Sequence, residues 1–145
     1  MASQTVRDAM VPEPAMLAAD ASAQDAGTAL VNPDVRALFV TDGDGRLLGV
    51  ITRKTLVREV VARGLDPRTT TVQAIAEAPH HTLDAGLELD LAFRFLEEHD
   101  LERVPVVEAD GRLVGVLSRA VVQRRLAEDE PPEPEPDSDR GSFVP

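Results

Sequence analysis

Two segments of the chain place their apolar residues at helical spacing. In residues 20–31, alanine and leucine side chains recur every three or four positions, and Asp20 or Ser22 can act as the N-cap. Residues 87–99 repeat this spacing with the larger side chains of leucine and phenylalanine. Each segment is therefore predicted to be an amphipathic helix that buries one face.

A pair of short apolar runs follows each predicted helix. The two runs of a pair are joined by TDGDGR in one case and by EADGR in the other, and Asp and Gly accept the positive backbone dihedral angles of a tight hairpin. Another helix is predicted after each pair, because Thr52 and Ser118 are good N-caps. The apolar runs are residues 35–40, 47–51, 101–107 and 113–117.

This whole pattern occurs twice. The segment DGRLLGVITR returns as DGRLVGVLSR 66 residues later, and the offset holds without a gap from residues 5–60 onto 71–126. Because a domain of 56 residues buries little of its surface, we expect the two copies to pack face to face as one module. The sequence predicts a mixed α/β (α+β) protein with one repeat at 1–64 and the other at 65–127.

Acidic residues dominate the charge of the chain. The net charge is −11, of which −6 comes from seven acids and one arginine in residues 128–145, and the rest of the chain is acidic too. Negative charge repels phosphate backbones and anionic lipids, so we expect neither nucleic acid nor membrane as a partner. The proline-rich segment 128–145 is predicted to be a disordered solubilising tail, with a docking peptide ending in Phe143 and Val144 as the alternative.

The composition excludes several kinds of site. The chain has no Cys, Trp or Tyr, so it has no disulfide, no thiolate nucleophile and few rings on which bases could stack. No apolar run approaches the roughly 18 residues of a membrane span, and no secretory pattern begins the chain, so a cytoplasmic location is predicted. His80, His81 and His99 lack the spacing of a metal site, and no catalytic group of nucleophile and base stands out.

The residues around the repeated turns carry a family resemblance. VRDAMVPEP and VRALFVTDGDGRLLGVITRKTL belong to copy one, and LERVPVVEADGRLVGVLSRAVV belongs to copy two. Over about residues 5–126 the chain resembles a tandem pair of CBS domains, also called a Bateman module. The resemblance implies two βαββα repeats packed about a pseudo-two-fold axis, no enzymatic activity, and assembly into a homodimer.

The same resemblance implies two ligand clefts between the repeats. Members of the family bind adenosine-containing molecules there, such as AMP, ADP, ATP or S-adenosylmethionine, and regulate an effector protein through occupancy of the cleft. In this chain, one cleft would consist of Thr5, Met10, Val35, Arg36, Ala37, Ser118, Ala120 and Val121. The other would consist of Thr52, Lys54, Thr55, Thr71, Ala76, Leu101, Glu102 and Arg103.

Two positions depart from the family pattern. The aspartate that holds ribose hydroxyls in the family falls at Thr55 and Val121 here. Losing a hydrogen bond to a charged group costs about 1.5–3 kcal/mol, so this departure leaves two hypotheses. The first is a non-catalytic sensor of an adenosine ligand, with Lys54 and Arg103 in its better cleft. The alternative is a degenerate pair that acts as a homodimeric structural or interaction module.

Overall fold

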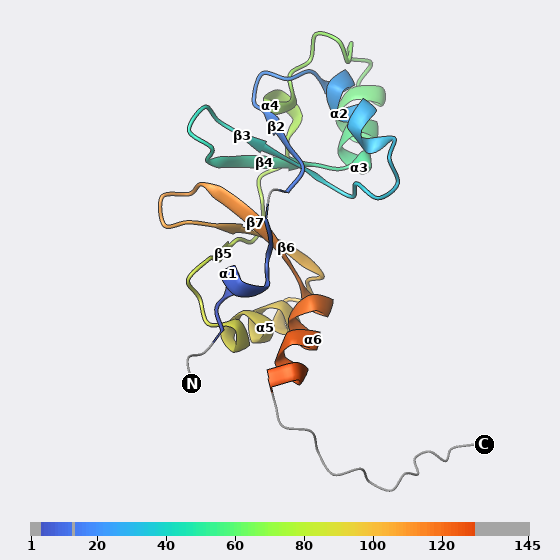
Figure 1. The fold of residues 1–145 in the computed structure, drawn as a ribbon. Coiled ribbons are helices and arrows are strands. Elements are labelled where there is room, and N and C mark those ends of the chain that lie inside the picture. The colour runs from blue at the N-terminus through green and yellow to red at the C-terminus, as the bar shows by residue number, and fades with distance from the viewer. Residues whose placement is uncertain (1–3, 13, 130–145) are drawn as a thin grey trace, which may run out of the picture.

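The computed structural model describes residues 4–12 and 14–129, which form two lobes (Figure 1). The first lobe contains a three-stranded sheet of order β2-β3-β4, in which β2 and β3 are parallel and β3 and β4 antiparallel. Its elements are β2 (Met16–Ala18), α2 (Ala23–Leu30), β3 (Leu38–Thr41), β4 (Leu47–Ile51), α3 (Arg53–Leu56), the π-helical turn η1 (Val57–Val61) and α4 (Val72–Ile75).

The second lobe contains a four-stranded sheet of order β1-β7-β6-β5. The strands β5 and β6 are parallel, and β6 and β7 form an antiparallel hairpin like that of the first lobe. The two sheets lie toward the middle of the molecule, and the longer helices lie at its two ends (Figure 1). The elements of this lobe are α1 (Val6–Ala9), β1 (Val11–Pro12), β5 (Leu83–Asp84), α5 (Leu89–Glu98), β6 (Arg103–Val107), β7 (Leu113–Ser118) and α6 (Arg119–Asp129).

The predicted local signals form the predicted elements, and the mixed α/β class is confirmed. The Ser22 hydroxyl accepts a hydrogen bond from the Asp25 N–H at 3.0 Å and caps α2. Gly45 and Gly111 have φ angles of +85° and +92° in the two hairpin turns. The helix α6 continues to Asp129, so the predicted tail begins with two helical residues, and its remainder, residues 130–145, lies outside the described residues.

The two repeats exchange their N-terminal segments. The strand β1 comes from the start of the chain but pairs with β7, and the helix α1 before it lies in the same lobe (Figure 1). In the opposite direction, the backbone of Glu77, just after α4, pairs with Val50 of β4 through hydrogen bonds of 2.8 and 3.0 Å. Each sheet therefore receives the N-terminal segment of the other repeat.

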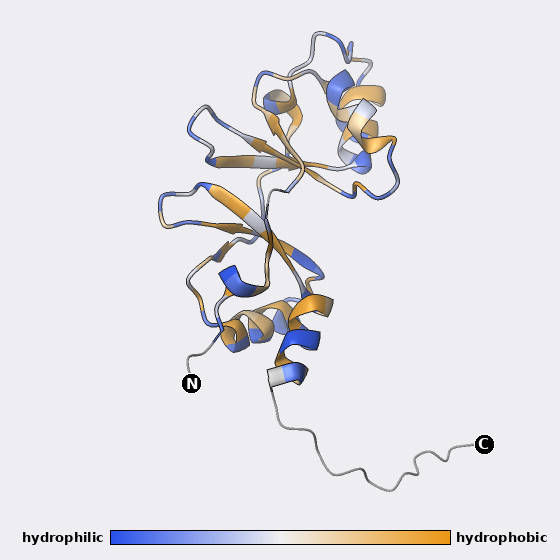
Figure 2. Ribbon diagram, viewed as in Figure 1, coloured by the Kyte–Doolittle hydropathy of each residue, from blue (hydrophilic) through white to orange (hydrophobic). Residues whose placement is uncertain are grey.

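The same exchange divides the hydrophobic core. Val6 and Ala9 of α1 are buried with Leu89, Leu96 and other residues of the second repeat. Val72 and Ile75 of α4 are buried with Leu30, Ile51 and other residues of the first repeat. Hydrophobic residues gather on the central strands and on one side of the helices, and the hairpin turns are hydrophilic (Figure 2).

The two hairpin turns hold the lobes together at one edge of the molecule. The Leu47 N–H donates to the Gly111 carbonyl at 3.1 Å, and the Leu113 N–H donates to the Gly45 carbonyl at 3.0 Å. These bonds relate equivalent positions of the two repeats reciprocally. They are consistent with the two-fold pairing that the duplicated sequence implies.

Candidate functional site

A cavity of about 510 Å³ lies between the two lobes. Strands of both sheets contribute to its wall, together with the segments before β3 and after α4 and the first turn of α3. Because sheet residues alternate between two faces, each strand can turn one set of side chains toward its own core and another toward this cavity. Apolar residues from both repeats line it, namely Val11, Val35, Phe39, Val50, Leu101, Val104, Pro105 and Val116.

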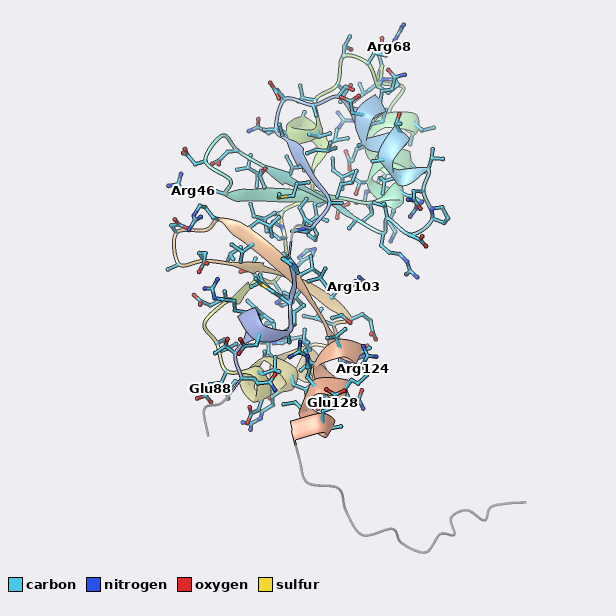
Figure 3. All side chains as sticks on the ribbon, in the orientation of Figure 1. Arg46, Arg68, Glu88, Arg103, Arg124 and Glu128 are labelled. Carbon is cyan, nitrogen blue, oxygen red and sulfur yellow. The ribbon has the colours of Figure 1, made fainter. Side chains whose placement is uncertain are left out.

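Two arginines without partners among the described residues line the cavity, together with the acidic residues Asp34 and Glu77. Arg36 precedes β3 and Arg103 begins β6, so each repeat provides one of them. Within residues 4–12 and 14–129, neither guanidinium has a hydrogen-bond or ion-pair partner. Figure 3 shows Arg103 where the two lobes meet, at the opposite edge of the molecule from Arg46. In a chain of net charge −11, two unpaired cations at one cavity favour an anionic ligand.

A polar group at the first turn of α3 forms another part of the wall. The Thr52 hydroxyl accepts the Thr55 N–H at 3.4 Å, and the Thr55 hydroxyl accepts the Thr52 N–H at 3.0 Å, which together form a capping box. The Thr55 hydroxyl also donates to the Glu77 carboxylate at 3.3 Å. Arg58 donates to the same carboxylate oxygen. Thr52, Thr55 and Glu77 all line the cavity.

Three rings pack together beside the cavity. His81 lies 5.4 Å from Phe95 and 4.9 Å from His99, measured between ring centroids, and His80 and His81 line the cavity. Among the described residues, no three His, Cys, Asp or Glu side chains gather in a way that could hold a metal ion.

Half of the predicted ligand residues line this cavity. They come from both of the clefts that the resemblance implies, and the structure brings them together around one continuous space, because both sheets face the same gap. These residues are Val35, Arg36, Ala37, Thr52, Thr55, Leu101, Arg103 and Ser118.

The other predicted ligand residues lie outside the lining and have local roles. Thr5 and Thr71 are the N-caps of α1 and α4. Met10 packs against Gly115 and Ala76 packs against Gly49, so closely that a Cβ atom on either glycine would overlap them. The exchanged segments cross the sheets at these two glycines. The remaining ones are on or beside α3 and α6, namely Lys54, Glu102, Ala120 and Val121.

Two charged residues among these are directed away from the cavity for identifiable reasons. Lys54 is exposed on α3. Because the side chains of successive helical residues point about 100° apart, the Lys54 side chain leaves the helix in a different direction from those of Thr52 and Thr55, which line the cavity. Glu102 accepts a hydrogen bond of 2.6 Å from Arg119. That bond raises the pKa of the Arg119 guanidinium above its ordinary value.

Glu77 is one of the lining residues that sequence reasoning missed, and Asp34 is another charged one. Glu77 stands in the segment between α4 and β5, where no helix or hairpin pattern marks it. Its place depends on the pairing of its backbone with Val50, which is 27 residues away in the chain. A weak signal existed, since Glu77 immediately follows the segment Thr71–Ala76 that the resemblance placed at a cleft.

A model of the CBS domain family matches residues 6–62 and again residues 72–128. The chain belongs to the CBS domain family. The tandem pair predicted from the sequence is confirmed, and the exchanged segments and the inter-lobe cavity described above are those of this pair.

Known relatives support the assignment. Hypoxic response protein 1 of Mycobacterium tuberculosis (strain CDC 1551 / Oshkosh) is 36% identical over 95 residues, which are 66% of this chain and 66% of that protein. GMP reductase of the same strain is 37% identical over 113 residues, which are 78% of this chain but 22% of the enzyme. The similarity to the enzyme is thus confined to a small part of it.

Solved structures share the fold of the pair. The crystal structure of Hypoxic Response Protein I with two coordinated zinc ions has a TM-score of 0.71 and 30% identity, covering 84% of this chain and 98% of that one. The crystal structure of CBSX2 in complex with AMP has a TM-score of 0.68 and 28% identity, covering 86% of this chain and 96% of that one. No helix among the described residues combines the length and the apolar character needed to cross a membrane.

Proposed function

We propose that this protein is a non-catalytic regulatory module that binds an adenosine-containing ligand in the cavity between its CBS repeats. The observation that carries the proposal is the pair of unpaired arginines, Arg36 and Arg103, in a largely apolar cavity of an acidic protein. The adenosine compound acts as a regulatory ligand, and the proposal includes no resident cofactor.

The size and lining of the cavity suit a nucleotide. A volume of about 510 Å³ lies within the roughly 300–1,000 Å³ of typical small-molecule sites. Apolar walls accept a planar base, and a guanidinium can donate two parallel hydrogen bonds to a phosphate. The relative CBSX2, solved in complex with AMP, shows that a pair of similar fold holds such a ligand.

Regulation would follow from the position of the cavity. A ligand that contacts Arg36 on one repeat and Arg103 on the other favours the packing of the lobes that satisfies both contacts. An effector protein, or a second copy in a homodimer, would then recognise that packing. The effector, the homodimer and the cytoplasmic location stay predictions from the sequence.

Calorimetric titration tests the proposal. We expect AMP, ADP, ATP or S-adenosylmethionine to bind the unchanged protein with micromolar affinity, and Arg103→Ala to weaken a phosphate-bearing ligand about tenfold or more, because a charge-assisted hydrogen bond is lost. Arg94→Ala is the matched control, since Arg94 is an exposed arginine of α5 outside the cavity. Absence of binding at millimolar ligand, or equal affinity in both variants, would contradict the proposal.

A second function is favoured by an exposed apolar face on the first lobe. Val31, Val57 and Val61 are 79%, 59% and 72% exposed around α2 and η1. Large exposed apolar residues gathered on neighbouring elements are typical of association surfaces. If no adenosine ligand binds, a homodimeric structural or interaction module is the better account, and sedimentation would show a dimer that Val57→Asp dissociates.

A further inference from the structure

The hydroxyl of Thr55 has no capacity left for a ligand. The residue is 1% exposed, and its hydroxyl oxygen accepts the Thr52 N–H and lies 3.2 Å from the Thr52 hydroxyl. Its single proton goes to Glu77. A hydroxyl has one donor, so the group that Thr55 presents to the cavity is the carboxylate that it holds in place.

Glu77 has one carboxylate oxygen engaged and one free. Thr55 and Arg58 both donate to Oε2, whereas no described residue donates to Oε1. The side chain is 40% exposed, and the residue lines the cavity. Since a carboxylate has lone pairs for about four hydrogen bonds, Oε1 can accept donors from a bound molecule.

The charges around the cavity restrict that molecule. Arg36 and Arg103 favour negative charge, while the carboxylates of Asp34 and Glu77 repel it and favour hydrogen-bond donors. No ion pair joins either arginine to Glu77 among the described residues, so the two kinds of group remain separate. A ligand that satisfies both carries an anionic group and, apart from it, neutral donors such as hydroxyl groups.

We propose that Glu77 is a specificity-determining residue, whose free oxygen accepts hydrogen bonds from the sugar hydroxyls of the ligand. The inference rests on the proposed function and adds a selectivity to it, namely that ribonucleotides bind in preference to deoxyribonucleotides. Thr55 and Arg58 are positioning residues that fix the direction of the carboxylate. The backbone bonds between Glu77 and Val50 fix its distance from the sheet.

Titration with sugar-modified nucleotides tests this selectivity. The unchanged protein is titrated with AMP, 2′-deoxy-AMP and 3′-deoxy-AMP, and we expect at least one deoxy compound to bind about tenfold or more weakly. In Glu77→Gln and Glu77→Ala, AMP should bind as weakly as that deoxy compound, so the preference disappears. Glu97→Gln, an exposed acid of α5 outside the cavity, should keep the preference. Circular dichroism of each variant verifies that it is folded.

The outcomes separate this inference from the proposed function. Equal binding of AMP and both deoxy compounds, or a preference that survives in both Glu77 variants, would overturn the role of Glu77 and leave the adenosine sensor intact. Absence of AMP binding to the unchanged protein would overturn the inference together with the sensor.

Discussion

At the scale of single residues, the two glycines of the repeated G-V motif decide where the exchanged segments can cross. A Cβ atom on Gly49 would lie 2.7 Å from the Ala76 Cβ and 2.9 Å from the Glu77 carbonyl oxygen. A Cβ atom on Gly115 would lie 2.8 Å from the Val11 carbonyl oxygen. Both glycines are therefore needed for close backbone approach.

We expect Gly49→Ala to destabilise the protein by about 1–3 kcal/mol, because the added methyl group overpacks against backbone and Cβ atoms that cannot turn away. Urea unfolding followed by circular dichroism measures the change. Gly43→Ala is the control, since a Cβ atom there meets nothing within 4 Å. Equal stability of the two variants would show that the crossing segment can shift at no cost. The same substitution should weaken ligand binding if Glu77 moves with the segment.

At the scale of elements, the hairpin turns are stabilised by ionised aspartates. The Asp42 carboxylate accepts the backbone N–H groups of Asp44 and Arg46, each at 2.9 Å. These bonds favour the charged form and lower the pKa of Asp42 below its ordinary value, with the bond from Arg46 as the largest cause. Asp110 has a lowered pKa for the same reason, through the N–H of Arg112.

A lowered pKa predicts loss of stability in acid. The bonds of Asp42 contribute in full above the ordinary aspartate pKa of about 4, and their contribution is lost as the pH falls through the lower value of the folded state. In Asp42→Asn the amide oxygen accepts without titrating, so we expect its Tm to fall less between pH 7 and pH 3. Asp44→Asn is the control, because the Asp44 carboxylate accepts a hydrogen bond from the Arg46 side chain and not from the backbone of the turn. Parallel Tm curves for the unchanged protein and Asp42→Asn would refute the account.

At the scale of the whole molecule, neither lobe has a complete core of its own. Val6 belongs to the first repeat but is fully buried in the second lobe, and Val72 belongs to the second repeat but is fully buried in the first. Unfolding either repeat would withdraw a helix from the core of its neighbour. The two lobes are therefore expected to unfold as one cooperative unit.

We expect Val6→Ala to lower the free energy of unfolding by about 2 kcal/mol. The substitution removes two buried methyl groups, at about 0.8 kcal/mol each, and leaves a cavity behind. Scanning calorimetry should show a single transition at a lower Tm. Val61→Ala, at a position 72% exposed, should change the stability by less than about 0.5 kcal/mol. Two resolved transitions, with only one shifted by Val6→Ala, would mean that the lobes unfold independently.

Local patterns in the sequence determined the elements. The spacing of apolar residues, the cap at Ser22 and the glycines of the turns depend on neighbours within a few positions, so they could be read directly. The duplication predicted that the two copies pack together, and the residues around the repeated turns carried the resemblance to the family whose model matches the chain.

The tertiary structure alone decided which edges pair and which side chains face the cavity. The exchange of α1 and α4 joins segments far apart in the chain, and no local spacing encodes it. Glu77 lies inside the cavity for the same reason, since a bridge to Val50 places it, whereas Lys54 lies outside because the turn of its own helix directs it away. The sequence by itself determined a CBS pair; the long-range pairing determined which of its residues a ligand can reach.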